Sequence, residues 1–268
     1  VLGRLPTDNE RATAGAFLQK RISAAKLTAP AKQVDQSVAP STGFKVNSPH
    51  ERLLVRASEK EGDDFTIESI VKLDSVDVNA ELRTLVSHWD GGKASLESFG
   101  WSIDVTGQKS RYKPRNILMQ LVGEDENSNI GYQVVASDIH IEVGRRYHLV
   151  VQVSSTKHTV TFTVRDLDTP TAAMRTAVVP MDRLTKLSQG TSPIVLGGLS
   201  KRTPTRQWDG QIEALRIVAG QTAETMLNTD PEQWNAGLFI WRAADPPNSH
   251  FTWQGADTQT EQEDDPAL

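Results

Sequence analysis

The sequence predicts an all-β protein built from two stacked antiparallel sheets, with one helix ahead of them. Residues 146–167 contain two successive runs in which apolar side chains occupy every second position. Runs of this kind recur over most of the chain, and glycine, asparagine and aspartate separate them at short intervals. Many short strands divided by turn residues are typical of a β-sandwich.

The clearest signal is the stretch of residues 146–167. Every second residue from Tyr147 to Val153 is apolar, and so is every second residue from Val160 to Val164. A side-chain period of two indicates a half-buried strand. The break at residues 155–157 has the length of a turn, so we expect an antiparallel hairpin. Such a hairpin is not stable alone in water, and a second sheet must cover its apolar face.

The helix is predicted at residues 8–26. Thr7 and Glu10 form the pattern of a capping box, and Leu18, Ile22 and Ala25 follow at helical spacing. This apolar stripe is too narrow to form a core, so the helix should dock on another surface. Proline and small polar residues follow it over residues 28–48. The surface on which the helix docks is therefore either this domain or a missing partner.

The strands are predicted to form one sandwich domain over residues 29–254. In chain order they are residues 65–73, 82–89, 100–105, 116–122, 132–136, the two runs of the hairpin, 173–179, 193–199, 211–218 and 250–253. In the strand at 211–218, Ile212 differs in parity from Leu215 and Ile217, and a β-bulge between residues 212 and 215 would bring the three to one face. The predicted shared core contains Phe65, Ile67, Leu149, Val151, Phe162, Ile212 and Ile217.

Charge and composition exclude several classes of protein. Residues 255–268 carry five carboxylates and no cation, which accounts for the whole net charge of −5. This composition predicts a disordered, solvated tail. The neutral remainder gives no reason to expect a nucleic-acid partner. No apolar run approaches the ~20 residues that cross a bilayer, and the absence of cysteine excludes disulfides, thiol catalysis and thiolate zinc sites.

Three segments together resemble the laminin-G-like domain, a concanavalin-A-like jelly roll. They are DDFTIESIVKL at residues 63–73, GRRYHLVVQV at residues 144–153, and Gly197-Gly198 followed by WDGQIEALRIV at residues 208–218. In that family a strand ending in Gly-Gly precedes an aromatic-Asp-Gly turn and an Ile-x-x-Leu-x-Ile strand. The resemblance covers residues 45–218 and implies a two-sheet antiparallel jelly-roll sandwich.

Two other segments resemble a narrower group. Residues 100–123 resemble the laminin-G-like module of large planctomycete-type surface or periplasmic proteins, which also carry cytochrome-c-like domains. The segment LGRLPTDNERATAGAFL near the start resembles a helix of a companion domain in those proteins. In those proteins a laminin-G-like module accompanies domains of unknown function. The resemblance implies a module of a larger exported protein, in the periplasm or outside the cell, with other host domains as partners. It also implies that residues 1–28 belong to a neighbouring domain of that host.

The sequence predicts that the protein is not an enzyme. Many jelly rolls of this type are glycoside hydrolases, which hold a pair of carboxylates at a fixed separation and place them on one strand as Glu-x-Asp-x-x-Glu. The acidic clusters of this chain, at residues 59–64 and 124–126, instead lie in turn-like sequence. No two histidines have metal-ligand spacing, and no nucleophile elbow, P-loop or dinucleotide fingerprint is present.

The family resemblance also makes calcium a candidate ligand, because calcium recurs in laminin-G-like domains. Calcium needs several oxygen ligands from loops, and Asp90 and Asp209 are the candidates for such a metal site. The aspartate of an aromatic-Asp-Gly turn can instead hydrogen-bond the backbone of its own turn. For Asp209 we favour this structural role.

The loop of residues 109–115 is the candidate ligand-binding site. It reads KSRYKPR and places Lys109, Arg111, Lys113 and Arg115 around Tyr112. Guanidinium groups match sulfate and carboxylate, and tyrosine can stack on a sugar face. The loop therefore predicts contact with an anionic or sulfated glycan, and the alternatives are a solvated hairpin loop or an interface to another domain.

Trp89, near a predicted strand end, is a further candidate contact, although large aromatic residues pack in cores by default. Two functions remain open. One is a non-catalytic recognition module for carbohydrate. The other is a structural or protein-interaction domain that packs between host domains and binds no small ligand. A structure with Tyr112 and Trp89 exposed in one concave groove would favour the first.

Overall fold

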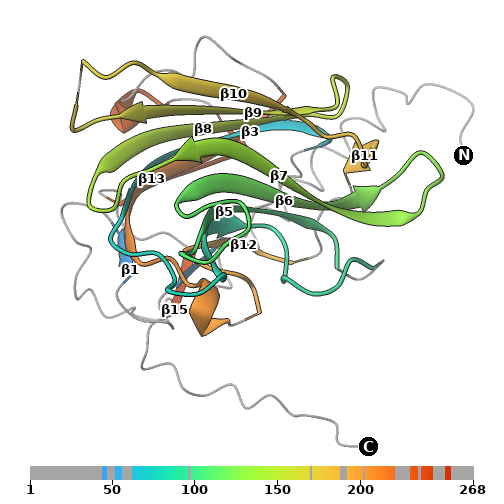
Figure 1. The fold of residues 1–268 in the computed structure, drawn as a ribbon, viewed down its shortest axis with the longest axis horizontal. Helices are drawn as coiled ribbons and strands as arrows, with labels where there is room; N and C mark the ends of the chain where they lie inside the picture. The colour runs from blue at the N-terminus through green and yellow to red at the C-terminus, as the bar shows by residue number, and fades with distance from the viewer. Residues whose placement is uncertain are drawn as a thin grey trace, which may run out of the picture. The chain divides into compact units, whose positions relative to one another are not determined.

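The computed structural model shows two antiparallel β-sheets (Figure 1). It describes residues 44–46, 52–55, 62–95, 98–169, 171–187, 192–201, 203–220, 230–234, 237–243 and 251–254. The two-sheet sandwich predicted from the sequence is confirmed. The helix predicted at residues 8–26, the boundary predicted after residue 28 and the acidic tail at 255–268 lie outside the described residues.

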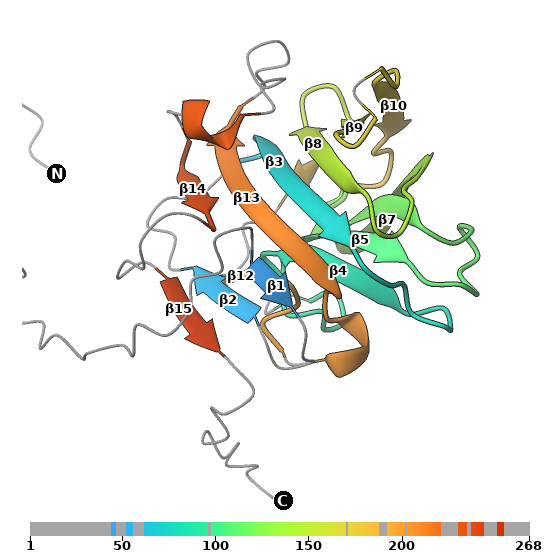
Figure 2. The ribbon, with the colours of Figure 1, turned by 90° about the vertical axis from the view of Figure 1, so that its left-hand side faces the viewer.

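In the described residues, the first sheet has seven strands and is called the seven-stranded sheet. Its order is β1 (Phe44–Val46), β13 (Gly210–Ala219), β3 (Asp64–Leu73), β8 (Arg146–Ser154), β9 (Thr159–Asp166) and β10 (Arg175–Pro180), and β14 (Phe239–Arg242) also pairs with β13. Strands β13, β3 and β8 lie side by side in Figure 2. Strands β8 and β9 are the predicted hairpin, with Val151 opposite Phe162.

The second sheet has eight strands in the same described residues and is called the eight-stranded sheet. Its order is β11 (Lys186–Leu187), β6 (Asn116–Glu124), β5 (Gly100–Thr106), β4 (Leu82–Ser87), β12 (Ile194–Leu196), β2 (Arg52–Val55) and β15 (Phe251–Gln254), and β7 (Ile130–His140) also pairs with β6. Two 3-10 turns, Pro204–Arg206 and Pro231–Gln233, lie in the connections before β13 and β14. The last strand predicted from the sequence, β15, pairs with β2.

One hydrophobic cluster lies between the sheets. It contains all seven residues that the alternation places in the core, and each of them is at most 3% exposed. The aromatic rings include Phe65 and Trp101, whose centroids lie 5.5 Å apart. This cluster confirms the core prediction, since residues with a period of two on both sheets meet in it.

The predicted bulge in β13 is also present. Ile212 lies opposite Val71 and Ala214 lies opposite Ile70, so Glu213 is the extra residue. The Glu213 carboxylate accepts two hydrogen bonds of 2.6 Å from the Arg146 guanidinium. The bulge thus places Leu215 and Ile217 on the core face, and it directs the Glu213 carboxylate toward Arg146 on β8.

Some strands differ from the prediction in length or were not predicted. Strand β7 has 11 residues, because polar side chains such as Gln133 and Ser137 occupy positions that the fold buries. Strand β2 has only the four residues RLLV, which is too short to display an alternating pattern. Strands β11 and β14 are similarly short. Strand β11 pairs with β6, which is distant in the sequence, and β14 pairs with the preceding strand, β13.

Candidate functional site

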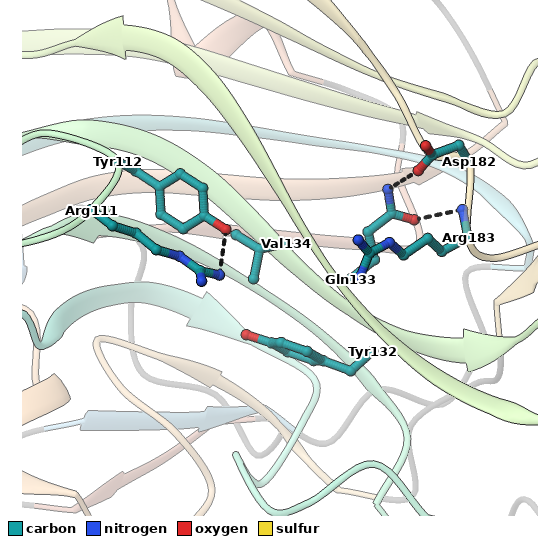
Figure 3. A pocket seen from close by; sticks show the side chains of 7 residues that line it. All are labelled: Arg111, Tyr112, Tyr132, Gln133, Val134, Asp182 and Arg183. Carbon is teal, nitrogen blue, oxygen red and sulfur yellow. Dashed lines mark hydrogen bonds between the residues drawn. The ribbon is translucent and has the colours of Figure 1, made fainter.

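An open pocket of about 290 Å³ lies at the β7 edge of the eight-stranded sheet (Figure 3). Three segments that are distant in the sequence build it: the loop between β5 and β6, strand β7, and the residues after β10. Its lining residues are Arg111, Tyr112, Tyr132, Gln133, Val134, Asp182 and Arg183. The loop predicted from its charge as a binding site therefore contributes Arg111 and Tyr112 to a pocket.

Hydrogen bonds to neighbouring strands hold the loop at residues 107–115. The Thr106 hydroxyl donates to the Lys113 carbonyl at 2.6 Å, and the Asn116 side chain donates to the Tyr112 carbonyl at 3.0 Å. Lys113 and Arg115 both adopt a φ of 63°, in the left-handed region that non-glycine residues seldom occupy. Strained backbone of this kind persists only where surrounding contacts hold it, so the loop has a defined shape.

The four cations of the loop do not share one environment. Arg111 donates to the Tyr112 hydroxyl at 2.8 Å, and its guanidinium lies 4.8 Å from the centre of the Tyr112 ring. The other three have partners outside the pocket: Lys109 contacts Asn79, Lys113 lies 3.8 Å from Asp138, and Arg115 pairs with Glu142. Only Arg111 among these four cations lines the pocket.

Tyr132 is one of five pocket residues that the sequence analysis did not predict as site residues. Its side chain is 41% exposed, and its hydroxyl donates to Gln120 Oε1 at 2.6 Å. Partial burial, reinforced by the charge of Asp104, raises the pKa of Tyr132 to about 12. The phenol therefore remains a neutral hydrogen-bond donor, and its ring forms an amphipathic wall of the pocket.

A buried polar network lies behind Tyr132. Gln120 donates to Asp104 at 2.7 Å, and Asp104 also accepts hydrogen bonds from Thr84, Ser102 and Arg206 at 2.5, 2.6 and 2.8 Å. Asp104 is fully buried. Since Asp104 fixes the donor end of the Gln120 amide, the oxygen at the other end is directed to Tyr132. The network thereby orients the exposed ring.

Trp89 lies beneath the surface and does not offer a ring face to a ligand. It is 4% exposed, and its ring centroid lies 6.0 Å from that of Tyr132. Its indole nitrogen donates to Ser98 Oγ at 2.8 Å. The exposed groove of Tyr112 and Trp89 is therefore not observed, and Trp89 supports Tyr132 from below.

The two candidate calcium ligands have partners in separate turns. Asp90 accepts hydrogen bonds from Ser98 Oγ at 2.5 Å and from the Gly92 amide at 2.8 Å. The Asp209 carboxylate accepts from the Ser75 hydroxyl. In the described part of the chain no group of three or more histidine, aspartate or glutamate residues could hold a metal ion. These residues do not fit a calcium site, which needs six to eight oxygens.

A second polar cluster lies on the outer face of the seven-stranded sheet. Glu68 contacts His148 Nε2 at 2.5 Å and Arg216 Nε at 2.6 Å, and Arg216 lies 4.9 Å from the ring centre of Trp234. Glu68, His148 and Arg216 are each no more than 6% exposed. A ligand from solvent has no access to groups buried to this extent, so we assign them to the structure of the sheet.

The comparisons with known proteins give likenesses in fold. No protein-family model matches the chain, and no curated protein matches it. Among the described residues no helix is long and apolar enough to cross a membrane.

Several solved structures are similar. Tailspike protein 2 of an Escherichia coli O157:H7 bacteriophage has 10% identity and a TM-score of 0.48, over 75% of this chain and 26% of the tailspike. The carbohydrate-binding module CBM40 of a Ruminococcus gnavus sialidase, bound to α2,3-sialyllactose, has 13% identity and a TM-score of 0.45, over 69% and 94%. Domains LG4–5 of the mouse laminin α1 chain have 14% identity and a TM-score of 0.45, over 77% and 49%. At these identities the likeness concerns the fold alone, and the chain spans about a quarter of the tailspike.

Proposed function

We propose that this chain is a non-catalytic carbohydrate-recognition module of a larger exported protein and that its glycan site is the pocket at the β7 edge. The observation that carries the proposal is the meeting of two tyrosines and two arginines in one open pocket of about 290 Å³. This volume lies just below the range for small-molecule sites, ~300–1,000 Å³. The pocket therefore suits a short glycan segment.

The chemistry of the pocket matches that of a sugar. A sugar ring presents C–H groups on its faces and hydroxyl groups around its rim, so it needs both apolar and polar contacts. Tyr132 and Tyr112 offer ring surface, and tyrosine combines an apolar body with a polar end. The guanidinium groups and the Asp182 carboxylate supply donors and an acceptor for the rim.

The same lining argues against glycoside hydrolysis. Most glycosidases use two carboxyl groups on either side of the scissile bond, ~5 to 9.5 Å apart. Among the residues that line this pocket, Asp182 is the one carboxylate. A site with one carboxylate can bind a glycan but lacks the second group that the usual mechanism requires, so we propose binding without turnover.

A glycan array on the full chain, followed by titration calorimetry, tests the function. We expect a glycan that binds the wild-type protein to bind Tyr132→Ala at least about tenfold more weakly, because the tyrosine ring that forms one wall of the pocket is lost. Val178→Ala is the control, since Val178 is 63% exposed on β10 and lies outside the pocket. The titration is done with and without calcium, and we expect the same glycan affinity in both conditions. If no glycan binds, or if Tyr132→Ala retains full affinity, the glycan proposal is wrong and the structural alternative replaces it.

A further inference from the structure

Arg183 is a second guanidinium in the pocket, which the loop sequence did not indicate. It follows β10, is exposed, and lines the pocket together with Arg111. In Figure 3 the two side chains extend from opposite sides toward Val134. The Arg183 backbone amide donates to Gln133 Oε1 at 3.1 Å, which anchors the residue. Its guanidinium makes no hydrogen bond or ion pair within the described part of the chain.

The charge at the pocket corresponds to one excess positive charge. Arg111 and Arg183 contribute two cations and Asp182 contributes one carboxylate. Asp182 Oδ1 accepts a hydrogen bond of 2.9 Å from Gln133, so the carboxylate is held on its own side of the pocket. Burying one anionic group between the guanidiniums would neutralise this excess.

A densely sulfated chain fits these residues less well than a ligand with one acid group. A polyanion would need further cations along the loop to bind its other sulfate groups. Lys113 and Arg115 are in the right segment, but they already pair with Asp138 and Glu142. A second anionic group would also meet the Asp182 carboxylate. The remaining guanidinium forks are planar and match the two oxygens of a carboxylate.

We propose that the pocket selects a sugar residue that carries a single carboxylate, with Arg111 and Arg183 on either side of that group. This inference rests on the proposed glycan-binding function and names its ligand class. A uronic acid and a sialic acid share the required chemistry. Tyr132 contacts the ring, and the two arginines supply the preference for charge.

The experiment is titration calorimetry of the full chain with three pairs of ligands. The first pair is galacturonic acid, which carries one carboxylate, and its methyl ester, in which an uncharged ester replaces that carboxylate. The second is 3′-sialyllactose and lactose. The third is a monosulfated disaccharide and its neutral counterpart. We expect one of the carboxylated ligands to bind at least about tenfold more tightly than its uncharged partner, as charge-assisted hydrogen bonds predict.

Arg183→Gln is the test variant, because Arg183 is exposed and its backbone anchor is retained. We expect it to lower the affinity for the charged ligand by a larger factor than the affinity for the uncharged partner, so that most of the preference for the charged ligand is lost. Arg165→Gln is the matched control, since Arg165 is an exposed guanidinium on β9 of the other sheet. An unchanged melting temperature shows that both variants are folded.

The possible results distinguish a wrong ligand class from a wrong glycan-binding function. If neutral glycans bind through Tyr132 and carboxylated ones bind no better, the ligand class is wrong and the binding function stands. Equal affinity for the monosulfated sugar, or a preference that survives in Arg183→Gln, also overturns the carboxylate assignment. If no glycan binds at all, the proposed function fails together with its ligand class.

Discussion

Replacing Asp104 by asparagine tests whether the network behind Tyr132 is a coupled unit. Asp104 is fully buried, and each of its two oxygens accepts two hydrogen bonds. In Asp104→Asn, the amide group faces two former donors whichever way it is turned. Arg206, whose side chain is 11% exposed, also loses its counter-ion. Breaking a buried ion pair on one side costs about 3–5 kcal/mol, and we expect a loss of unfolding free energy in this range.

Urea unfolding followed by tryptophan fluorescence and circular dichroism measures this loss. Asp63→Asn is the control, because Asp63 is exposed and its loss should stay within ~0.5 kcal/mol. Arg206→Met and the double variant complete a cycle, in which we expect a coupling of ~0.5–3 kcal/mol. A loss below about 1 kcal/mol for Asp104→Asn, or simple additivity in the cycle, would refute the coupled network.

Three further predictions concern the core, the pocket and the N-terminal segment predicted from the sequence. Phe162→Ala should lose ~3–5 kcal/mol of unfolding free energy, because the ring is fully buried; a loss below ~1 kcal/mol contradicts its place in the core. In an ultraviolet titration, the difference between the curves of the wild type and Tyr132→Phe should show a phenol group that ionises near pH 12. The stability linked to this raised pKa is complete below pH ~10, where the unfolded chain titrates, and is lost as the pH rises toward 12; a step near pH 10 would show that the hydroxyl is free. Removing residues 1–28 should leave the β circular dichroism and a cooperative melt, whereas an insoluble product would make that segment part of the core.

Alternation along single strands was sufficient to predict most of the sandwich. The hairpin of β8 and β9, the core rings and the bulge at Glu213 all follow from the parity of apolar residues over a few positions. Strand β2 did not follow, because four residues between charged neighbours carry too little periodic signal. Local pattern thus predicts strands where they are long and half-buried.

The pocket was predictable only in part, because three distant segments form it. The charge of the loop drew attention to Arg111 and Tyr112, yet nothing local links them to Tyr132 or Arg183. Asp104 occupies a polar position of an alternating strand, which normally indicates a solvent-facing side chain. Its burial depends on Arg206, which lies 102 positions later in the sequence. An alternating pattern over a few residues contains no information about an ion-pair partner this far along the chain. It therefore could not predict that Asp104 is buried.

The buried Glu68 cluster determines which face of the central strands turns inward. Alternation alone is ambiguous there, because β3 and β8 have buried residues on both faces, and Ile70 belongs to a separate apolar cluster on the outer face. A slip of one residue in the pairing would turn every side chain of a strand to the opposite face. For β3, such a slip would move the Glu68 carboxylate into the hydrocarbon interior and away from both His148 and Arg216. The ion pairs of this cluster therefore favour one register of the three strands. A slipped register would bury the Glu68 charge without a partner, which costs more free energy than misplacing apolar side chains alone.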